Sequence, residues 1–170
     1  MNCQILLKKA SNELRSLNIK NPILDSEILL ANSLKISREK LMLNLNKDIN
    51  NEEMNFFNIL LNKRKKKEPI AYIFKNKEFW KTNFFVNHSV LIPRPDTELL
   101  VEESLKYLQN NKEQQVLDIG TGSGCILISI LKERKKCKGT GIDLSKEAIK
   151  IAKINAKIQQ LQNRVKFIYS

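Results

Sequence analysis

Three glycines at alternate positions form the part of this sequence best suited to chemistry. The segment Val116–Gly124 reads VLDIGTGSG, an apolar run that ends in an acidic residue and continues into Gly120, Gly122 and Gly124. Residues without a Cβ let the backbone turn sharply and let a ligand approach the main chain closely. A second acidic residue, Asp143, closes the next apolar run. This arrangement predicts a binding site for a cofactor that contains a nucleoside.

The spacing of the glycines excludes the dinucleotide-binding fingerprint. That fingerprint requires a further glycine at the position of Cys125, or at Leu127 in the shifted register. The remaining pattern, acidic-x-Gly-x-Gly-x-Gly, resembles that of methyltransferases that use S-adenosylmethionine (SAM). The structural alternative is a Gly-rich turn in an arbitrary loop. A strand before the glycines, a helix after them and Asp143 beyond favour the cofactor site.

Length and composition indicate a globular protein. The 170 residues suffice for one ordinary domain or two small ones, and contents of 42% hydrophobic and 28% charged residues are typical of soluble domains. The first ten residues lack the apolar core of a signal peptide, and no apolar run approaches the roughly 20 residues of a membrane span. We therefore expect a cytoplasmic protein without a membrane partner.

Cysteine and histidine are too few and too scattered to form a metal site or a disulfide framework. Cys3, Cys125 and Cys137 lie far apart and have no nearby histidine, which predicts reduced thiols. His88 is the only histidine, so zinc binding and Ser-His-Asp catalysis have little to build on. We expect no metal.

The net charge of +12 raises the question of a polyanionic partner. The basic cluster Lys63–Lys67 could contact RNA or a nucleoprotein. Lysine is abundant along the whole chain, however, and no strip of interleaved aromatic residues accompanies the charge. Direct nucleic-acid binding is therefore not expected.

The first part of the chain, residues 1–68, is predicted to be a small helical domain. It contains no glycine between Ile5 and Lys67, and its apolar residues recur at helical spacing, mostly as core. Helices are expected to start at Asn21-Pro22, after Ser37 and near Asn51. Residues 69–95 are rich in β-branched and aromatic residues, which predicts a connector with a β-hairpin that turns at residues 81–83.

The remaining residues, 96–170, alternate between strand and helix patterns. Asp96 is placed to cap a helix that runs from Leu99 to Leu108. The following elements are predicted as strand 114–119, helix 123–134, strand 138–143, helix 145–158 and strand 165–169. Alternation of this kind predicts a parallel sheet of order 3-2-1, the first half of a Rossmann-like α/β domain, with the cofactor at the carboxyl ends of its strands.

Three landmarks in this order carry a family resemblance. They are PIAYI at 69–73 with EFW at 78–80, LIPRPDTE at 91–98, and VLDIGTGSG at 116–124. Over essentially its whole length the chain resembles the HemK/PrmC family of release-factor glutamine methyltransferases. The resemblance implies SAM-dependent methylation of the side-chain amide (N5) of the glutamine in the Gly-Gly-Gln motif of peptide chain release factors. It also implies that residues 1–68 recognise that substrate.

The same resemblance implies the roles of the residues around the glycines. Gly120, Thr121, Gly122, Ser123 and Gly124 would form the loop under the methionine part of SAM. Asp143 would accept hydrogen bonds from the ribose hydroxyls. Both roles agree with the interpretation of the glycine spacing given above.

The family's catalytic motif, Asn-Pro-Pro-Tyr after the fourth strand, has no counterpart in these 170 residues. Asn21-Pro22 is followed by Ile23 and lies in the helical region. In the family the motif holds the glutamine amide for in-line attack on the methyl group, so positioning and electrostatics contribute most of the rate. We therefore predict no catalytic residue here, an incomplete sheet with one unpaired strand edge, and no appreciable methyl transfer by this chain alone.

Two alternatives remain open. The chain could be a catalytically inactive fragment that still binds a release factor. It could also be an N-methyltransferase of the same fold that acts on another amide or on a nucleobase, which the LIPRPDTE segment and the helical domain disfavour.

Overall fold

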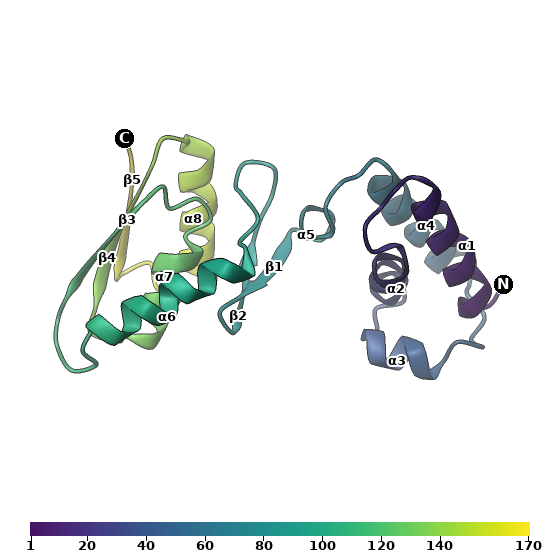
Figure 1. The fold of residues 1–170 in the computed structure, drawn as a ribbon, viewed down its shortest axis with the longest axis horizontal. Coiled ribbons are helices and arrows are strands. Elements are labelled where there is room, and N and C mark those ends of the chain that lie inside the picture. The colour runs from purple at the N-terminus through teal and green to yellow at the C-terminus, as the bar shows by residue number, and fades with distance from the viewer. The chain divides into compact units, whose positions relative to one another are not determined.

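The computed structural model describes residues 1–170 and divides the chain into two compact units. The first unit, Met1–Ile73, is entirely helical, and the second, Phe74–Ser170, contains all the strands. Figure 1 shows helices α1 to α5 in the first unit and the strands with helices α6 to α8 in the second. The predicted fold class, a helical region followed by part of a Rossmann-like sheet, is confirmed.

Three helices of the helical unit, α2, α3 and α4, start where the sequence predicted them. Its helices are α1 (Cys3–Ser16), α2 (Pro22–Ser33), α3 (Arg38–Leu43), α4 (Asn51–Lys65) and the short α5 (Ile70–Ile73). The hydroxyl of Ser37 caps α3 by accepting a hydrogen bond from Lys40 N. Asn50 and Glu53 form a reciprocal capping box at the start of α4.

The apolar pattern of the helical unit is only partly core. Helix α1 buries Cys3, Leu6, Ala10 and Leu14, whose spacing places them on one face of the helix. Ile5, by contrast, is 57% exposed. The expectation that the apolar residues are mostly core is therefore correct for one stripe of α1 and wrong for its neighbouring positions.

Two residues of the basic cluster at Lys63–Lys67 form ion pairs within the helical unit. The Arg64 guanidinium contacts the Asp25 carboxylate at 2.7 Å, and both side chains are largely buried. Lys65 contacts Glu13 at 2.8 Å. Buried charges require such partners, because desolvation of an unpaired ion is very unfavourable. These two basic residues stabilise the packing of α4 against other helices of the unit.

The predicted β-hairpin is present, with a different turn. Strand β1 (Asn76–Phe79) pairs antiparallel with β2 (Thr82–Phe85), so the turn consists of Trp80 and Lys81 alone. Both turn residues have positive φ, 44° and 60°, as a two-residue type I′ hairpin turn requires. The prediction of a turn at residues 81–83 is wrong because Thr82 and Asn83 already pair with β1.

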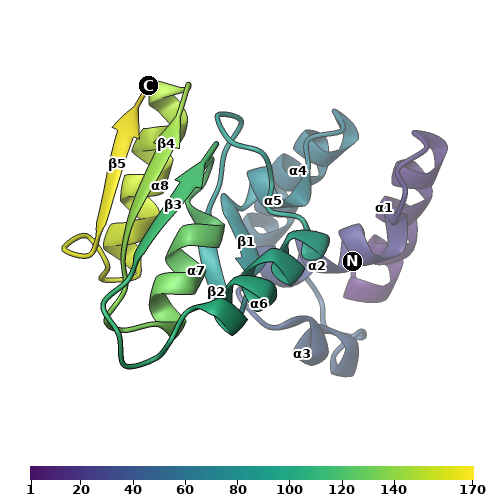
Figure 2. The same ribbon diagram turned by 60° about the vertical axis from the view of Figure 1, so that its left-hand side comes forward.

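The second unit contains the predicted three-stranded parallel sheet. Strands β3 (Gln115–Ile119), β4 (Lys138–Asp143) and β5 (Val165–Tyr169) lie in the order β3-β4-β5. Helices α7 (Cys125–Glu133) and α8 (Lys146–Ile158) connect them and cover the same face of the sheet (Figure 2). Right-handed crossovers in one direction place both helices there. The outer edge of β3 has no pairing strand, as predicted.

Helix α6 (Glu98–Tyr107) begins differently from the prediction. Pro95–Thr97 form a 3-10 turn, and Thr97 occupies the N-cap position of α6 without a side-chain capping bond. The prediction that Asp96 caps the helix is wrong. Pro95 starts the turn one residue too early, so Asp96 lacks the extended backbone that a capping residue adopts.

All three cysteines are buried and free. Cys3 lies in the helical unit, whereas Cys125 and Cys137 belong to the core between the helices and the sheet of the second unit. Burial raises the pKa of the Cys125 thiol to about 11, so this thiol is neutral at pH 7 and unreactive. None of the helices is long and apolar enough to cross a membrane.

Candidate functional site

The alternating glycines form a loop at the carboxyl end of β3. Gly120, Gly122 and Gly124 all have positive φ, between 54° and 78°. The backbone N–H groups of Gly120 and Thr121 donate to the Ile142 carbonyl of the neighbouring strand β4, at 2.8 and 3.0 Å. The loop is therefore fastened to the end of β4 and leads directly into α7.

Asp143, the last residue of β4, accepts hydrogen bonds from the glycine loop and from the start of α8. One carboxylate oxygen accepts a hydrogen bond from Gly122 N at 2.8 Å, and the other accepts one from Ser145 N at 2.9 Å. The structure thus brings Asp143 and the glycine loop together, as the sequence pattern indicated. Each carboxylate oxygen has two lone pairs, so Asp143 can accept further hydrogen bonds from a ligand.

The two hydroxyl residues of the loop point into the protein. Thr121 is 5% exposed, and its Oγ1 donates to the Asp118 carboxylate at 2.7 Å. Ser123 is 3% exposed and interacts with the Cys125 thiol. These buried hydroxyls stabilise the loop, so we expect Thr121 and Ser123 to meet a ligand through their backbone only.

Gly120 is the glycine whose missing side chain leaves open space. A Cβ built on Gly120 would have no atom within 4 Å, whereas one on Gly139 would come within 2.5 Å of the Leu127 side chain. Gly139 is required for packing of α7 on the sheet. Gly120 is required only for its backbone conformation and for whatever occupies the space beside it.

Asp118 is the less obvious acid of the site. Burial raises the pKa of its carboxyl, and the nearby negative charge of Asp143 adds to this effect. The hydrogen bond from Thr121 opposes the shift without cancelling it. The folded chain therefore holds a proton on Asp118 more readily than the unfolded chain does.

We expect Asp118→Asn to stabilise the chain progressively as the pH rises. The raised pKa means that the parent chain loses stability as the pH increases from the ordinary value of 3.8 through the folded-state pKa, while the amide has no charge to bury. Urea unfolding followed by the fluorescence of Trp80, the only tryptophan, measures the difference between the two chains from below pH 3.8 to pH 7. A difference that does not change with pH would contradict this assignment.

One residue of the site escaped the sequence analysis. Asn155 of α8 is completely buried, and its Nδ2 donates to the Ser123 carbonyl at 2.8 Å. The available signal was a polar residue within the buried stripe of α8, beside Ala152 and Ala156. Such a residue requires hydrogen-bonding partners, although its position along the chain does not reveal which ones.

The LIPRPDTE segment supplies a structural contact in the second unit. The Glu98 carboxylate accepts a hydrogen bond from Trp80 N at 3.0 Å, so the start of α6 supports the strained turn of the hairpin. The indole N–H of Trp80 donates to Glu133 of α7, also at 3.0 Å. Arg94, in the same segment, is exposed.

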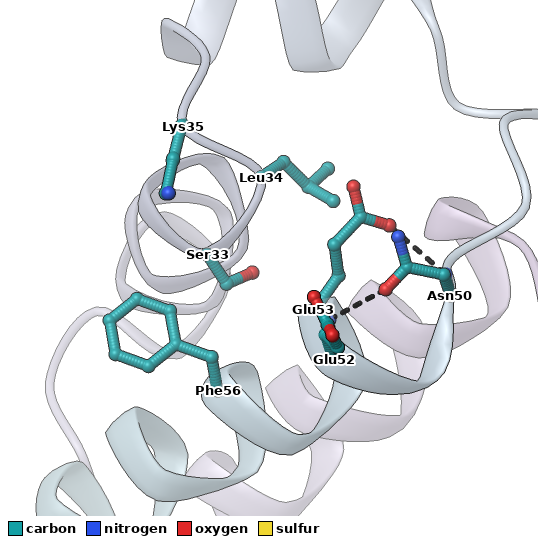
Figure 3. A pocket seen from close by; sticks show the side chains of 7 residues that line it. All are labelled: Ser33, Leu34, Lys35, Asn50, Glu52, Glu53 and Phe56. Atoms are coloured by element: carbon teal, nitrogen blue, oxygen red, sulfur yellow. Dashed lines mark hydrogen bonds between the residues drawn. The ribbon is translucent and has the colours of Figure 1, made fainter.

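The helical unit contains a separate hollow of about 490 Å³ (Figure 3). It is lined by Ser33, Leu34, Lys35, Asn50, Glu52, Glu53 and Phe56. The Glu53 carboxylate accepts from Asn50 N at 3.0 Å and contacts Lys47 at 3.1 Å. These contacts use the carboxylate to cap the amino end of α4. The hollow therefore has the chemistry of a capped helix end and lacks a nucleophile paired with a base.

Two family models match the chain. Residues 6–74 match the PrmC N-terminal domain, and residues 110–170 match a methyltransferase domain. The two matches follow the helical unit and the Rossmann-like part of the second unit.

Curated relatives match along nearly the whole chain. A release factor glutamine methyltransferase from Buchnera aphidicola subsp. Baizongia pistaciae is 46% identical over 96% of this chain, and one from Leptospira interrogans is 44% identical over 97%. The chain spans 58% of the length of each. A solved SAM-dependent methyltransferase from Geobacter sulfurreducens, in complex with S-adenosyl-L-homocysteine, is 31% identical; the match covers 45% of this chain and 29% of that one, with a TM-score of 0.38.

Proposed function

Since the chain belongs by sequence to the family of release factor glutamine methyltransferases, over the part of those proteins that it spans, we propose that it supplies the substrate-docking and SAM-binding parts of such an enzyme. The reaction is transfer of the SAM methyl group to the side-chain amide nitrogen of the glutamine in the Gly-Gly-Gln motif of release factors. The 170 residues contain no Asn-Pro-Pro-Tyr motif to orient that amide. Methyl transfer by this chain alone is therefore not part of the proposal.

The glycine loop and Asp143 are the proposed SAM site. The observation that carries this assignment is the open space beside the Gly120 backbone, at the same strand ends as the Asp143 carboxylate. A ligand can approach the main chain there because no Cβ intervenes. The amino end of α7, which begins at Cys125, favours a negatively charged group such as the SAM carboxylate.

The roles of the residues follow from their chemistry. When bound, SAM would supply an electrophilic methyl group on its sulfonium. The backbone of residues 120–124 would hold the methionine part. Asp143 would accept hydrogen bonds from the ribose hydroxyls through the lone pairs that Gly122 and Ser145 leave unused.

We assign substrate docking to the helical residues 1–68, linkage to residues 69–95, and SAM binding to residues 96–170. The partner is a peptide chain release factor, which implies action in the cytoplasm. No direct nucleic-acid contact is required. In support of this, the basic cluster at residues 63–67 commits Arg64 and Lys65 to ion pairs within the helical unit.

The test is a comparison of SAM affinities by calorimetry. We expect the parent chain to bind SAM and Asp143→Asn to bind it on the order of tenfold or more weakly, because a charged acceptor strengthens hydrogen bonds to hydroxyl groups. Glu147→Gln is the matched control, since Glu147 carries the same charge in the first turn of α8 and its side chain is 61% exposed. Its affinity should equal that of the parent chain.

Absence of SAM binding by the parent chain would overturn the proposed site. Equal loss of SAM affinity in Asp143→Asn and Glu147→Gln would show that the loss follows from the change in net charge and not from a specific contact of Asp143. Capture of a release factor by the chain, with SAM bound and no methyl transferred, would establish docking and cofactor binding as its share of the function. Preferential capture of DNA over a release factor would favour the nucleobase alternative.

A further inference from the structure

Asn155 is a polar side chain in the middle of the apolar face of α8. It is 0% exposed and lies among the buried residues Ile151, Ala152 and Ala156. Burying a primary amide is unfavourable unless its oxygen and its N–H groups find partners. In Asn155 both N–H donors and the oxygen are used, so its side chain is fixed in one position.

The partners of Asn155 come from two separate segments. Its Oδ1 accepts a hydrogen bond from Phe85 N at 2.7 Å, and its Nδ2 donates to Phe85 O at 3.0 Å. The same Nδ2 donates to Ser123 O at 2.8 Å. Phe85 is the last residue of β2, and Ser123 belongs to the glycine loop. One amide thus joins the hairpin to the proposed SAM loop.

A second amide, at the C-cap of α8, bonds to the hairpin and to Lys132 of α7 but not to the glycine loop. Gln159, one turn after Asn155, donates to Asn83 O at 2.9 Å and accepts from the Thr82 hydroxyl at 3.0 Å. Alternate residues of an edge strand expose their backbone groups on the same side, so Asn83 and Phe85 both face α8. The two amides hold the outer edge of β2, and only Asn155 also bonds to the glycine loop.

We propose that Asn155 is a positioning residue that couples the hairpin to the SAM loop. By donating a hydrogen bond to the Ser123 carbonyl, it holds the loop in the conformation that leaves the Gly120 backbone accessible to a ligand. Through Phe85 it makes that conformation depend on the position of β2, which leads into the segment 91–98. The proposal rests on the proposed function of the loop as the SAM site.

Asparagine suits this position because three backbone groups converge on it. They require one acceptor and two donors at the end of a short side chain, which a primary amide provides. Aspartate has nearly the same shape and can still accept from Phe85 N. When ionised it cannot donate to Phe85 O or Ser123 O. At a pH at which the new carboxyl is ionised, Asn155→Asp therefore removes the bond to the loop with little change in volume.

The experiment compares Asn155→Asp with Gln159→Glu, the same amide-to-acid change one turn away. We expect Asn155→Asp to raise the dissociation constant for SAM on the order of tenfold, and Gln159→Glu to change it less than about twofold. Hydrogen exchange in the ligand-free chains is the second readout. Asn155→Asp should accelerate exchange in both residues 82–87 and residues 120–124, whereas Gln159→Glu should accelerate it only in residues 82–87.

The two readouts separate failure of this proposal from failure of the proposed function. If the parent chain does not bind SAM, the proposed function fails, and the exchange pattern still decides whether Asn155 couples the two segments. Acceleration confined to residues 82–87 in Asn155→Asp would overturn the coupling, as would equal loss of SAM affinity in both variants.

A measurement on the unsubstituted chain covers the case in which Asn155→Asp does not fold. The side-chain NH₂ resonances of Asn155 and Gln159 can be followed by NMR while SAM is added. Coupling predicts a shift for Asn155, and a shift at least several-fold smaller for Gln159. Unchanged Asn155 resonances at saturating SAM would contradict the proposal.

Discussion

Replacing Gly120 with alanine should weaken SAM binding on the order of tenfold or more, while lowering the free energy of unfolding by only about 1 kcal/mol. The cost in stability is small because the new Cβ meets no atom within 4 Å, so only the positive φ of 77° is unfavourable. The cost in affinity is large because that Cβ enters the space through which a ligand would approach the main chain. Calorimetry with SAM and urea unfolding measure the two quantities.

Gly139→Ala is the matched control for this prediction. Its Cβ would come within 2.5 Å of the Leu127 side chain, so we expect a loss of about 1–3 kcal/mol in stability. Gly139 lies near the start of β4, whereas Asp143 ends that strand. The affinity of the folded Gly139→Ala chain for SAM should therefore stay close to that of the parent. If the two variants lose affinity equally, Gly120 has no special relation to the ligand.

Arg164→Met should lower the free energy of unfolding of the second unit by about 2–4 kcal/mol. The Arg164 guanidinium donates to the carbonyl of Leu131 at 2.7 Å and to those of Arg134, Lys135 and Cys137 at 2.9 to 3.1 Å. These carbonyls lie at and just beyond the end of α7, where they lack helical partners, and the positive charge also complements the helix dipole. Methionine keeps much of the apolar stem and loses every donor.

Urea unfolding monitored by Trp80 fluorescence measures this effect, because Trp80 lies in the second unit. Arg164→Lys is the control that keeps the charge without the planar donor group, and we expect an intermediate loss. Lys150→Met, also in the second unit, should cost less than about 1 kcal/mol, since Lys150 and its partner Glu147 are both largely exposed. A loss in Arg164→Met no larger than in Lys150→Met would show that the four hydrogen bonds contribute little.

The alternating elements of the second unit could be predicted because their signals are local. Strands β3 and β5 are short runs rich in apolar residues, and β4 lies between two helical patterns. Helix α8 has an apolar stripe and a recognisable start at Ser145, whose hydroxyl accepts from Ala148 N. The glycines located the loop, and the acid at the end of the next strand located its partner. Strand order followed from the handedness of crossovers.

The features that sequence did not reveal depend on backbone strain or on distant partners. Trp80 and Lys81 adopt positive φ, which residues with a Cβ rarely do, so nothing local marked them as the turn. Asn155 bonds to Phe85, 70 residues earlier, and Arg164 bonds to Leu131, 33 residues earlier. Such partners are set by tertiary packing. A single sequence does not indicate how far along the chain the partner of a given residue lies.

The distribution of the three cysteines makes the opening of each unit separately measurable. Cys3 is enclosed in the helical unit, and Cys125 and Cys137 are enclosed in the core of the α/β unit. A buried thiol reacts with an alkylating reagent only when the surrounding structure opens, so alkylation kinetics read by peptide mass spectrometry report local unfolding free energies. The unmodified chain thus contains one native reporter for the helical unit and two for the other.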